Sequence, residues 1–225
     1  MVEDVDEVKL VGDTFDDCAV AAKKYTEENG MTFVPPFDDY RIIEGQGTVG
    51  VEILEDQTDI DYLFVPVGGG GLLSGTALTV HYLTPNCQVI AGEPEGAADA
   101  IFSFQSGKIE KAPYIKTIAD GLLTNLSDKT LEIIRKHVAD ILLANDDQIL
   151  ATMRLLWERM KIIVEPSGAV PLAALLANKE RFAGKRVGIV ISGGNVDLKI
   201  ANLATDGPNP NLFVAELDLA IVASI

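Results

Sequence analysis

Four consecutive glycines stand between a predicted strand and a predicted helix in this chain. The run covers residues 68–71, after the apolar segment 62–67 and before an apolar stretch that begins at Leu72. Glycine reaches positive φ without steric cost, so such a loop can turn its amide groups inward as a concave nest. The first turn of the helix adds free amides and a partial positive charge. The loop therefore predicts a bound phosphate, and close packing of strand on helix is the alternative role for the glycines.

The surrounding sequence narrows the kind of phosphate site. No Gly-Lys-Ser/Thr follows the run, so it is not a nucleotide-binding P-loop. Leu73 takes the place of the third glycine of a dinucleotide-binding motif. Between Arg41 and Lys108 the chain has no lysine or arginine. Backbone amides and the helix dipole would therefore hold the phosphate, unless a basic residue folds in from elsewhere.

The composition excludes several classes of function. The 225 residues include 34 acidic and 18 basic side chains, a net charge of −16, which argues against nucleic-acid binding. Apolar runs fall short of the roughly 20 residues of a membrane span, and the acidic start is unlike a signal peptide. Cys18 and Cys87 form no C-x-x-C motif, and two histidines, His81 and His137, are too few for a typical zinc site. We therefore expect a cytoplasmic protein.

Strand-like runs alternate with segments of helical period along the chain. This pattern predicts an α/β fold, a three-layer parallel sheet with helices on both faces. Strands are expected at residues 8–11, 31–34, 62–67, 88–92, 141–143 and 187–191. Helices are expected at residues 14–30, 45–55, 72–82, 97–106 and 125–138, after Asn145, and at 169–176, with Thr14, Asn145 and Ser167 as N-caps. A turn-rich linker, 207–211, precedes an apolar tail, 212–225, whose pattern fits a strand or a short helix.

Four motifs together resemble one enzyme family. They are Val65-Pro-Val-Gly-Gly-Gly-Gly-Leu-Leu-Ser-Gly, Gly45-Gln-Gly-Thr, Val164-Glu-Pro-Ser-Gly-Ala and Ser192-Gly-Gly-Asn-Val-Asp-Leu. In order and approximate spacing they resemble the threonine/serine dehydratase and serine racemase group, from about Val8 to Leu198. The resemblance implies the tryptophan synthase β-like fold and a pyridoxal 5′-phosphate cofactor.

The resemblance also implies roles for particular residues. The amides of Gly68, Gly69, Gly70 and Gly71, with Leu72 after them, would hold the cofactor phosphate. Ser192, followed by Gly193, would place its hydroxyl against the pyridine nitrogen, and a loop serine bonding its own backbone is the alternative. Glu165 would lie near the polar edge of the ring, or else simply interact with a helix dipole.

A divalent-cation site is implied as well, formed by the carboxylates of Glu93 and Asp99 and the carbonyl of Ala97. Oxygen ligands of this kind suit Mg²⁺, Ca²⁺ or Mn²⁺. On spacing alone, two carboxylates six residues apart are common on any acidic surface.

The family's Schiff-base lysine has no counterpart in this sequence. The family places it in a Ser-x-Lys-x-Arg-Gly-like segment, followed by a Ser-Gly-Asn-His-like loop, and neither occurs among the twelve lysine contexts here. We therefore expect an N-terminally truncated version of the fold, inactive alone. Residues 1–36 would be a remnant of the small domain, 37–206 the large cofactor-binding domain, and 207–225 an atypical tail.

The expected activity is dehydration of L-threonine or L-serine to a 2-oxo acid and ammonia, by a homodimer in the full-length form. The segment at residues 35–39, Pro-Pro-Phe-Asp-Asp, looks closer to dehydratases than to racemases. Serine racemase is one alternative, and a non-catalytic remnant or subunit that binds a phosphate ligand is another.

Overall fold

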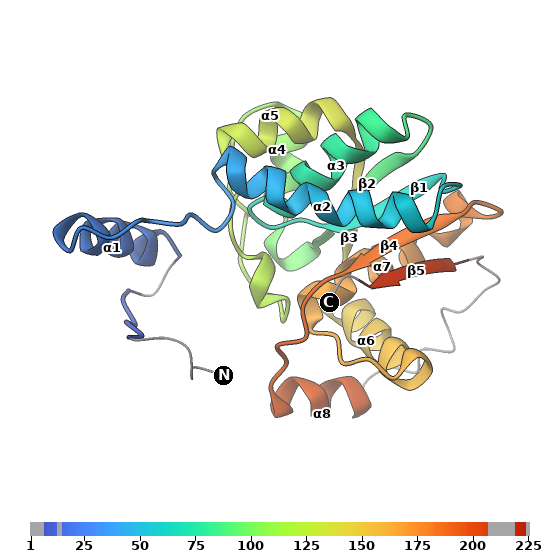
Figure 1. Ribbon diagram of the computed structural model, residues 1–225. Coiled ribbons are helices and arrows are strands. Elements are labelled where there is room, and N and C mark those ends of the chain that lie inside the picture. Colours follow the sequence, from blue (N-terminus) through green and yellow to red (C-terminus); the bar gives the residue numbers. More distant parts are fainter. Residues whose placement is uncertain (1–6, 13–14, 207–218, 224–225) are drawn as a thin grey trace. The chain divides into compact units, whose positions relative to one another are not determined.

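The computed structural model describes residues 7–12, 15–206 and 219–223, and the chain divides into two compact units (Figure 1). The first unit is Met1–Pro36 and the second is Phe37–Ile225. None of the described helices is long and apolar enough to cross a membrane.

The described residues of the first unit contain one helix, α1 (Phe15–Glu28). It ends as predicted near Gly30, which has a φ of +63°, and the amide of Met31 donates to the carbonyl of Thr26 at 2.8 Å. The expected strands at residues 8–11 and 31–34 are wrong, since neither segment has a sheet partner among the residues that the structure describes, and a strand requires one. The expected cap Thr14 lies outside the described residues.

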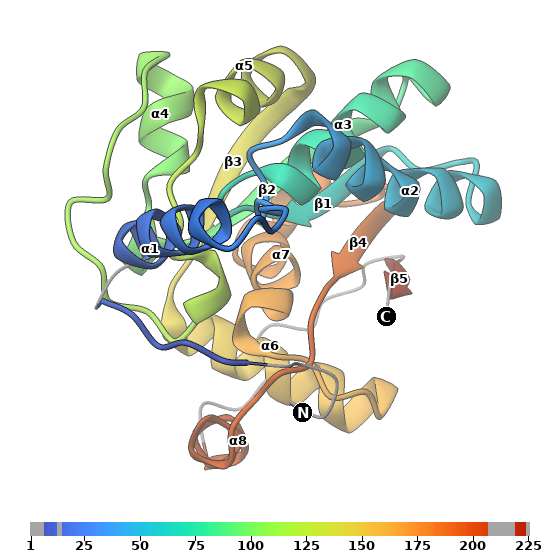
Figure 2. The ribbon, with the colours of Figure 1, turned by 60° about the vertical axis from the view of Figure 1, so that its left-hand side comes forward.

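The described part of the second unit is built on a five-stranded, fully parallel sheet with the order β3-β2-β1-β4-β5 (Figure 2). The central strands at residues 62–66 and 187–191 are almost wholly buried on both faces, as parallel sheets require, whereas residues 138–144 are only partly buried. The strands are β1 (Tyr62–Pro66), β2 (Gln88–Pro94), β3 (Val138–Ala144), β4 (Val187–Ile191) and β5 (Leu219–Ala223). Four of them match predicted strands, and β5 shows that residues 219–223 of the tail form a strand rather than a helix.

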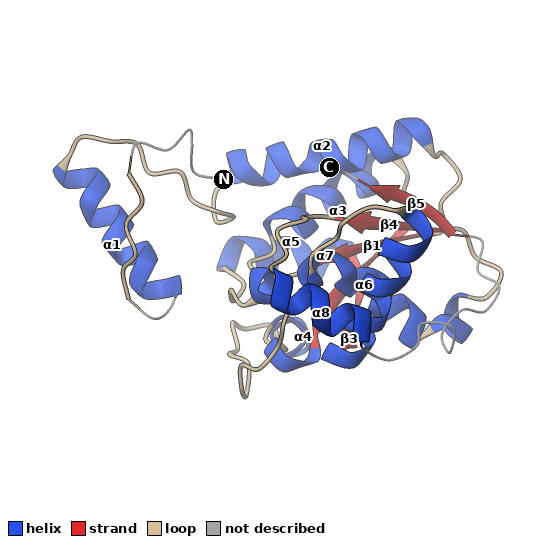
Figure 3. Ribbon diagram, turned by 90° about the horizontal axis from the view of Figure 1, so that it is seen from below, coloured by secondary structure: helices blue, strands red, loops and turns tan. Residues whose placement is uncertain are grey.

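Helices cover both faces of the sheet, which confirms the predicted architecture (Figure 3). Along β1, Leu63 and Val65 pack toward α2, α3 and α5, whereas Phe64 packs toward α6 and α7. The helices are α2 (Tyr40–Asp56), α3 (Gly71–Leu83), α4 (Ala100–Ser106), α5 (Asp128–His137), α6 (Asp146–Met160), α7 (Pro166–Ala177) and α8 (Leu198–Asp206). Short 3₁₀ turns are η1 (Glu95–Ala97), η2 (Asp120–Leu122) and η3 (Lys179–Phe182).

Several helix starts differ from the sequence prediction by three residues or more, namely those of α2, α4, α5 and α7. Helix α2 begins at Tyr40, because Asp39 caps it by accepting from the amide of Arg41 at 2.8 Å. The glycines that the prediction placed at its start lie inside it. A Cβ at Gly47 would stand 3.0 Å from Oγ1 of Thr79 on α3, so glycine permits the close packing of the two helices.

The predicted cap Ser167 is wrong, whereas Asn145 is confirmed. Asn145 caps α6 by accepting from the amide of Gln148 at 3.0 Å. Helix α7 begins earlier than predicted, at Pro166, with Glu165 at the N-cap position. Proline suits a first helical position, because an amide hydrogen there would have no acceptor within the helix.

Candidate functional site

The residues predicted to hold the cofactor follow the strands at the point where the strand order of the sheet reverses. Strand β1 lies between β2, which comes next in the chain, and β4, which comes later. Open α/β sheets bind ligands at the carboxyl ends of strands at such a switch point. The glycine loop, residues 68–71, follows β1, and the loop at residues 192–195 follows β4. Because β1 and β4 are parallel neighbours, both loops lie at the same edge of the sheet.

The glycine loop leads directly into α3. Gly70 is the N-cap residue, with a φ of +86°, and no side chain caps the helix. The first amides of α3 have no acceptor within the helix, so this terminus suits an anion. Leu72, in the first turn, is half-buried.

Each glycine of the loop also meets a neighbour closely. A Cβ at Gly70 would stand 2.9 Å from Cδ1 of Ile134 and from Cβ of Thr130, both on α5. A Cβ at Gly68 would stand 3.0 Å from Cα of Leu122, and one at Gly69 would collide with the ring of Phe37. The close packing proposed as the alternative role is therefore present, and it is compatible with a phosphate nest because Cβ and amide groups point in different directions.

Glu165 links the loop after β4 to helix α7. Its Oε2 accepts from the amide of Asn195 at 2.8 Å, and its own amide donates to the carbonyl of Gly193 at 3.2 Å. A Cβ at Gly193 would collide with the Glu165 carboxylate. Burial raises the pKa of Glu165, the amide of Asn195 opposes this rise, and the charge of Asp120 adds to it.

Two residues that the sequence analysis gave no site role join this edge. The amide of Gly121, in η2, donates to Oγ of Ser167 at 3.0 Å. A Cβ at Gly121 would stand 3.6 Å from Oε1 of Glu165, and η2 also borders Gly68 through Leu122. These contacts connect segments 46 residues apart, and no local sequence pattern announces them.

One lysine approaches the segment beside the glycine loop. Nζ of Lys129, on α5, lies 3.0 Å from Oδ1 of Asp38, which follows Phe37 in the chain. The hydrogen bond to the Asp38 carboxylate raises the pKa of Lys129. Lys129 is therefore already paired with Asp38.

The predicted cation ligands form a second, buried group at the end of β2. Glu93 accepts from the amides of Ala100 at 2.6 Å and Ile101 at 3.0 Å, at the start of α4. Asp99 is 3% exposed, and its Oδ2 has no hydrogen-bond partner. Burial raises the pKa of Glu93 to about 8 and that of Asp99 to about 7.

The cation group has limits as a preformed metal site. The described residues contain no group of three or more His, Cys, Asp and Glu side chains arranged to hold a metal. The carbonyl of Ala97 accepts from the amide of Asp99 at 3.0 Å. Two carboxylates and one carbonyl are therefore the most that these residues supply.

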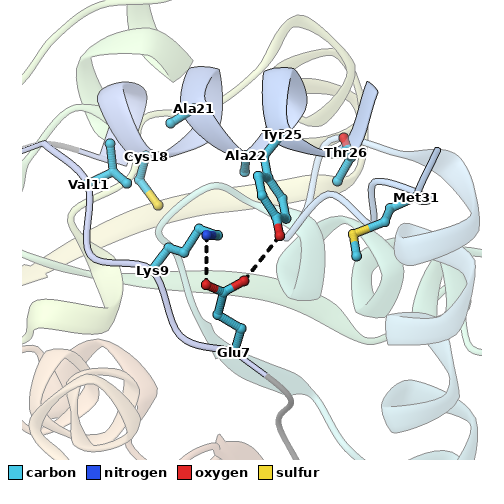
Figure 4. A pocket seen from close by; sticks show the side chains of 9 residues that line it. All are labelled: Glu7, Lys9, Val11, Cys18, Ala21, Ala22, Tyr25, Thr26 and Met31. Atoms are coloured by element: carbon cyan, nitrogen blue, oxygen red, sulfur yellow. Dashed lines mark hydrogen bonds and ion pairs between the residues drawn. The ribbon is translucent and has the colours of Figure 1, made fainter. Parts of the chain in front are cut away.

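A cavity of about 440 Å³ lies in the first unit and contains none of the predicted site residues (Figure 4). Glu7, Lys9 and Tyr25 line it. Nζ of Lys9 lies 2.8 Å from Oε1 of Glu7, and the Tyr25 hydroxyl donates to Oε2 of Glu7 at 3.1 Å. The side chains of Glu7, Lys9 and Tyr25 therefore satisfy one another.

Comparison with known proteins supports the resemblance drawn from the motifs. Residues 5–193 match the family model described as "pyridoxal-phosphate dependent enzyme". The chain is 49% identical to the β-hydroxyaspartate dehydratase of Paracoccus denitrificans, over 78% of this chain and 56% of that protein. It is 47% identical to the serine racemase of Dictyostelium discoideum, again over 78% of this chain and 56% of the relative.

Solved structures agree in fold. The processed threonine deaminase isoform 2 of Solanum lycopersicum superposes with a TM-score of 0.83 at 33% identity, covering 88% of this chain and 56% of that chain. The chain spans just over half the length of the relatives it matches. It has the fold of the type II pyridoxal-phosphate enzymes, as predicted, and it belongs to the family of pyridoxal-phosphate dependent enzymes.

Proposed function

We propose that this chain forms the cofactor-binding part of an ammonia-lyase that converts L-threonine or L-serine to a 2-oxo acid and ammonia. The observation that carries the proposal is the N-terminus of α3, which has no capping side chain and directly follows the glycine loop. It lies at the switch point of the sheet, in a chain that matches the family model. Net loss of water from the substrate, followed by hydrolysis of the resulting imine, accounts for both products.

The residues present fit pyridoxal 5′-phosphate. Gly68, Gly69, Gly70, Gly71 and Leu72 would hold its phosphate, since the terminus has free amides, a positive dipole end and no capping side chain. Ser192 would meet the ring nitrogen, with Gly193 beside it and Glu165 at the polar edge. When bound, the cofactor supplies an electron sink that eases loss of the Cα proton. A serine hydroxyl is a poor acid and would leave the ring nitrogen unprotonated, which favours elimination over transamination.

A substrate with an uncharged side chain would add no further negative charge beside Glu165 and Asp120. The relatives reported above are named for β-hydroxy amino acids. Glu165 and Asp120 already repel each other at this edge. A second substrate carboxylate, as in β-hydroxyaspartate, would add a third negative group. Threonine and serine avoid that cost, so we favour them.

Serine racemase is the second candidate, favoured by the 47% identity to the Dictyostelium discoideum enzyme. A racemase needs a second base on the far face of the substrate, and no residue of this chain is assigned to that task. A phosphate-binding subunit without catalysis is the third candidate, because the chain spans just over half of its relatives. With the lysine-bearing segment of a relative supplied, measuring D-serine and 2-oxo acid from L-serine in one assay separates all three.

We also place the divalent cation at Glu93, Asp99 and the carbonyl of Ala97. The supporting observation is Asp99 Oδ2, which is buried without a hydrogen-bond partner. A hard cation with water ligands would satisfy this oxygen.

The test of the activity uses the chain alone and the chain supplied with the lysine-bearing segment of a relative, fused or separate. We expect 2-oxo acid from L-threonine or L-serine only when that segment is present. Replacing its lysine should remove turnover again. Absence of turnover in every combination, despite pyridoxal phosphate binding, would favour the non-catalytic candidate.

A further inference from the structure

Phe37 lies against two of the four glycines. A Cβ at Gly69 would collide with the Phe37 ring, and one at Gly71 would stand 2.9 Å from Cβ and 3.2 Å from Cα of Phe37. Residues 69 and 71 therefore share a side of the loop, and Phe37 covers that side. The ring is half-buried.

The Cβ position of Gly70 faces α5 and the segment just before it. A Cβ at Gly70 would stand 2.9 Å from each of three side-chain atoms, which belong to Leu126, Thr130 and Ile134. The loop backbone is thus held between Phe37 on one side and an apolar surface on the other.

Phe37 is itself tied to two helices. Its carbonyl accepts from the amide of Asp39 at 3.0 Å, and Asp39 caps α2. Asp38 pairs with Lys129 of α5 at 3.0 Å. Since α5 also supports Gly70, one helix holds both the underside of the loop and the segment that covers it.

We propose that Phe37 is a positioning residue for the phosphate site: its ring and backbone hold Gly69, Gly70 and Gly71 in the conformation that binds the anion. Glycine has the largest conformational freedom of any residue, so a run of four glycines keeps one shape only when its neighbours impose it. If the binding-competent shape becomes less populated, the apparent affinity falls by the same fraction. This inference rests on the proposed function of the glycine loop.

The first experiment measures amide hydrogen exchange in the unliganded 225-residue chain. Phe37→Ala should speed exchange in peptides that cover residues 68–73, because the loop loses the aromatic ring that packs against Gly69. The matched control is Phe102→Ala, which removes an aromatic ring that is 42% exposed on α4. Exchange at residues 68–73 that is the same in parent and Phe37→Ala would overturn the inference, whatever the ligand data show.

The second experiment measures binding of inorganic phosphate and of pyridoxal 5′-phosphate to the same chains. Phe37→Ala should weaken both ligands by about tenfold, the loss expected if the competent fraction falls to a tenth. Phe37→Leu should recover part of the loss. Ser192→Ala should weaken only pyridoxal phosphate, because inorganic phosphate has no ring. Equal affinities in Phe37→Ala and the parent would overturn the inference while the proposed site stands.

Two further outcomes are decisive. If the parent binds neither ligand, the proposed site fails, and the positioning role fails with it. If Phe37→Ala does not fold, Phe37→Leu provides both readouts. In Phe37→Leu, exchange at residues 68–73 should then be faster and phosphate affinity weaker than in the parent. Exchange and affinity equal to those of the parent would overturn the proposal.

Discussion

Replacing Asp99 by asparagine should stabilise the second unit at high pH but much less at low pH, in chelated buffer. Asp99 is 3% exposed, and burial raises its pKa from the ordinary value near 3.8 to about 7. The folded chain therefore holds this proton more tightly than the unfolded chain. The resulting stability is present below pH 4, and it is lost as the pH rises from there through 7.

The size of the effect follows from the same two values. At 1.36 kcal/mol per pKa unit, full ionisation of folded Asp99 costs roughly 4 kcal/mol. Between pH 5 and pH 8 the free energy of unfolding of the parent should fall by roughly 2–3 kcal/mol through Asp99. Asparagine does not titrate, so the difference in unfolding free energy between Asp99→Asn and parent should grow by that amount. The substitution also relieves Glu93, whose pKa the Asp99 charge raises.

Urea unfolding at pH 5, 6, 7 and 8 measures this difference. The chain has one tryptophan, Trp157, whose Nε1 donates to the carbonyl of Val164 at 3.0 Å, so its fluorescence reports on the second unit. Glu95→Gln, an exposed carboxylate two residues from Glu93, is the matched control and should leave the pH dependence unchanged. Parallel stability curves for Asp99→Asn and parent from pH 5 to 8 would refute the reasoning.

Two further predictions concern ligands. Gly70→Asp or Gly71→Asp should abolish pyridoxal phosphate binding, because a carboxylate would enter an anion site and, at Gly70, a side chain would be forced to a φ of +86°. Gly70→Ala separates strain from charge, and unchanged affinity in the aspartate variants would contradict the site. Mg²⁺, Ca²⁺ or Mn²⁺ should raise the thermal midpoint. At a cation concentration 100 times the Kd, binding to the folded state adds roughly 2.7 kcal/mol to the free energy of unfolding. Glu93→Gln with Asp99→Asn should remove the rise, and a response that survives both changes would place the cation elsewhere.

The sequence predicted the sheet of the second unit well, because buried parallel strands are continuous apolar runs. Residues 62–67 and 187–191 became β1 and β4 with almost the expected bounds. The failures lie where a distant partner decides the structure. Residues 8–11 have the composition of a strand, yet the described structure provides no strand beside them. Gly47 reads as a helix start until its contact with Thr79 is known.

The candidate site was predictable in part for the same reason. The glycine loop and Ser192 follow strands, so parallel topology alone places them at one edge. Ser167 reads as a cap from its local sequence, and only the fold shows it accepting from Gly121. Phe37 carries no sequence signal of its contact with the loop. The two histidines, His81 and His137, lacked partners in sequence, yet their rings lie 4.4 Å apart.

The contacts of Lys129 bear on whether this chain can catalyse alone. A base for the Cα proton must be unprotonated near the working pH and held within about 3 Å of that carbon. Asp38 holds Lys129 in an ion pair and raises its pKa, so the amine stays charged. The lysine that the fold pairs with Asp38 is therefore unsuited to that task. We expect the chain to form 2-oxo acid no faster than free pyridoxal phosphate, and Lys129→Met to leave that rate unchanged. Turnover above the free cofactor that disappears in Lys129→Met, or on replacing any other of the twelve lysines, would show that the catalytic amine lies within these 225 residues.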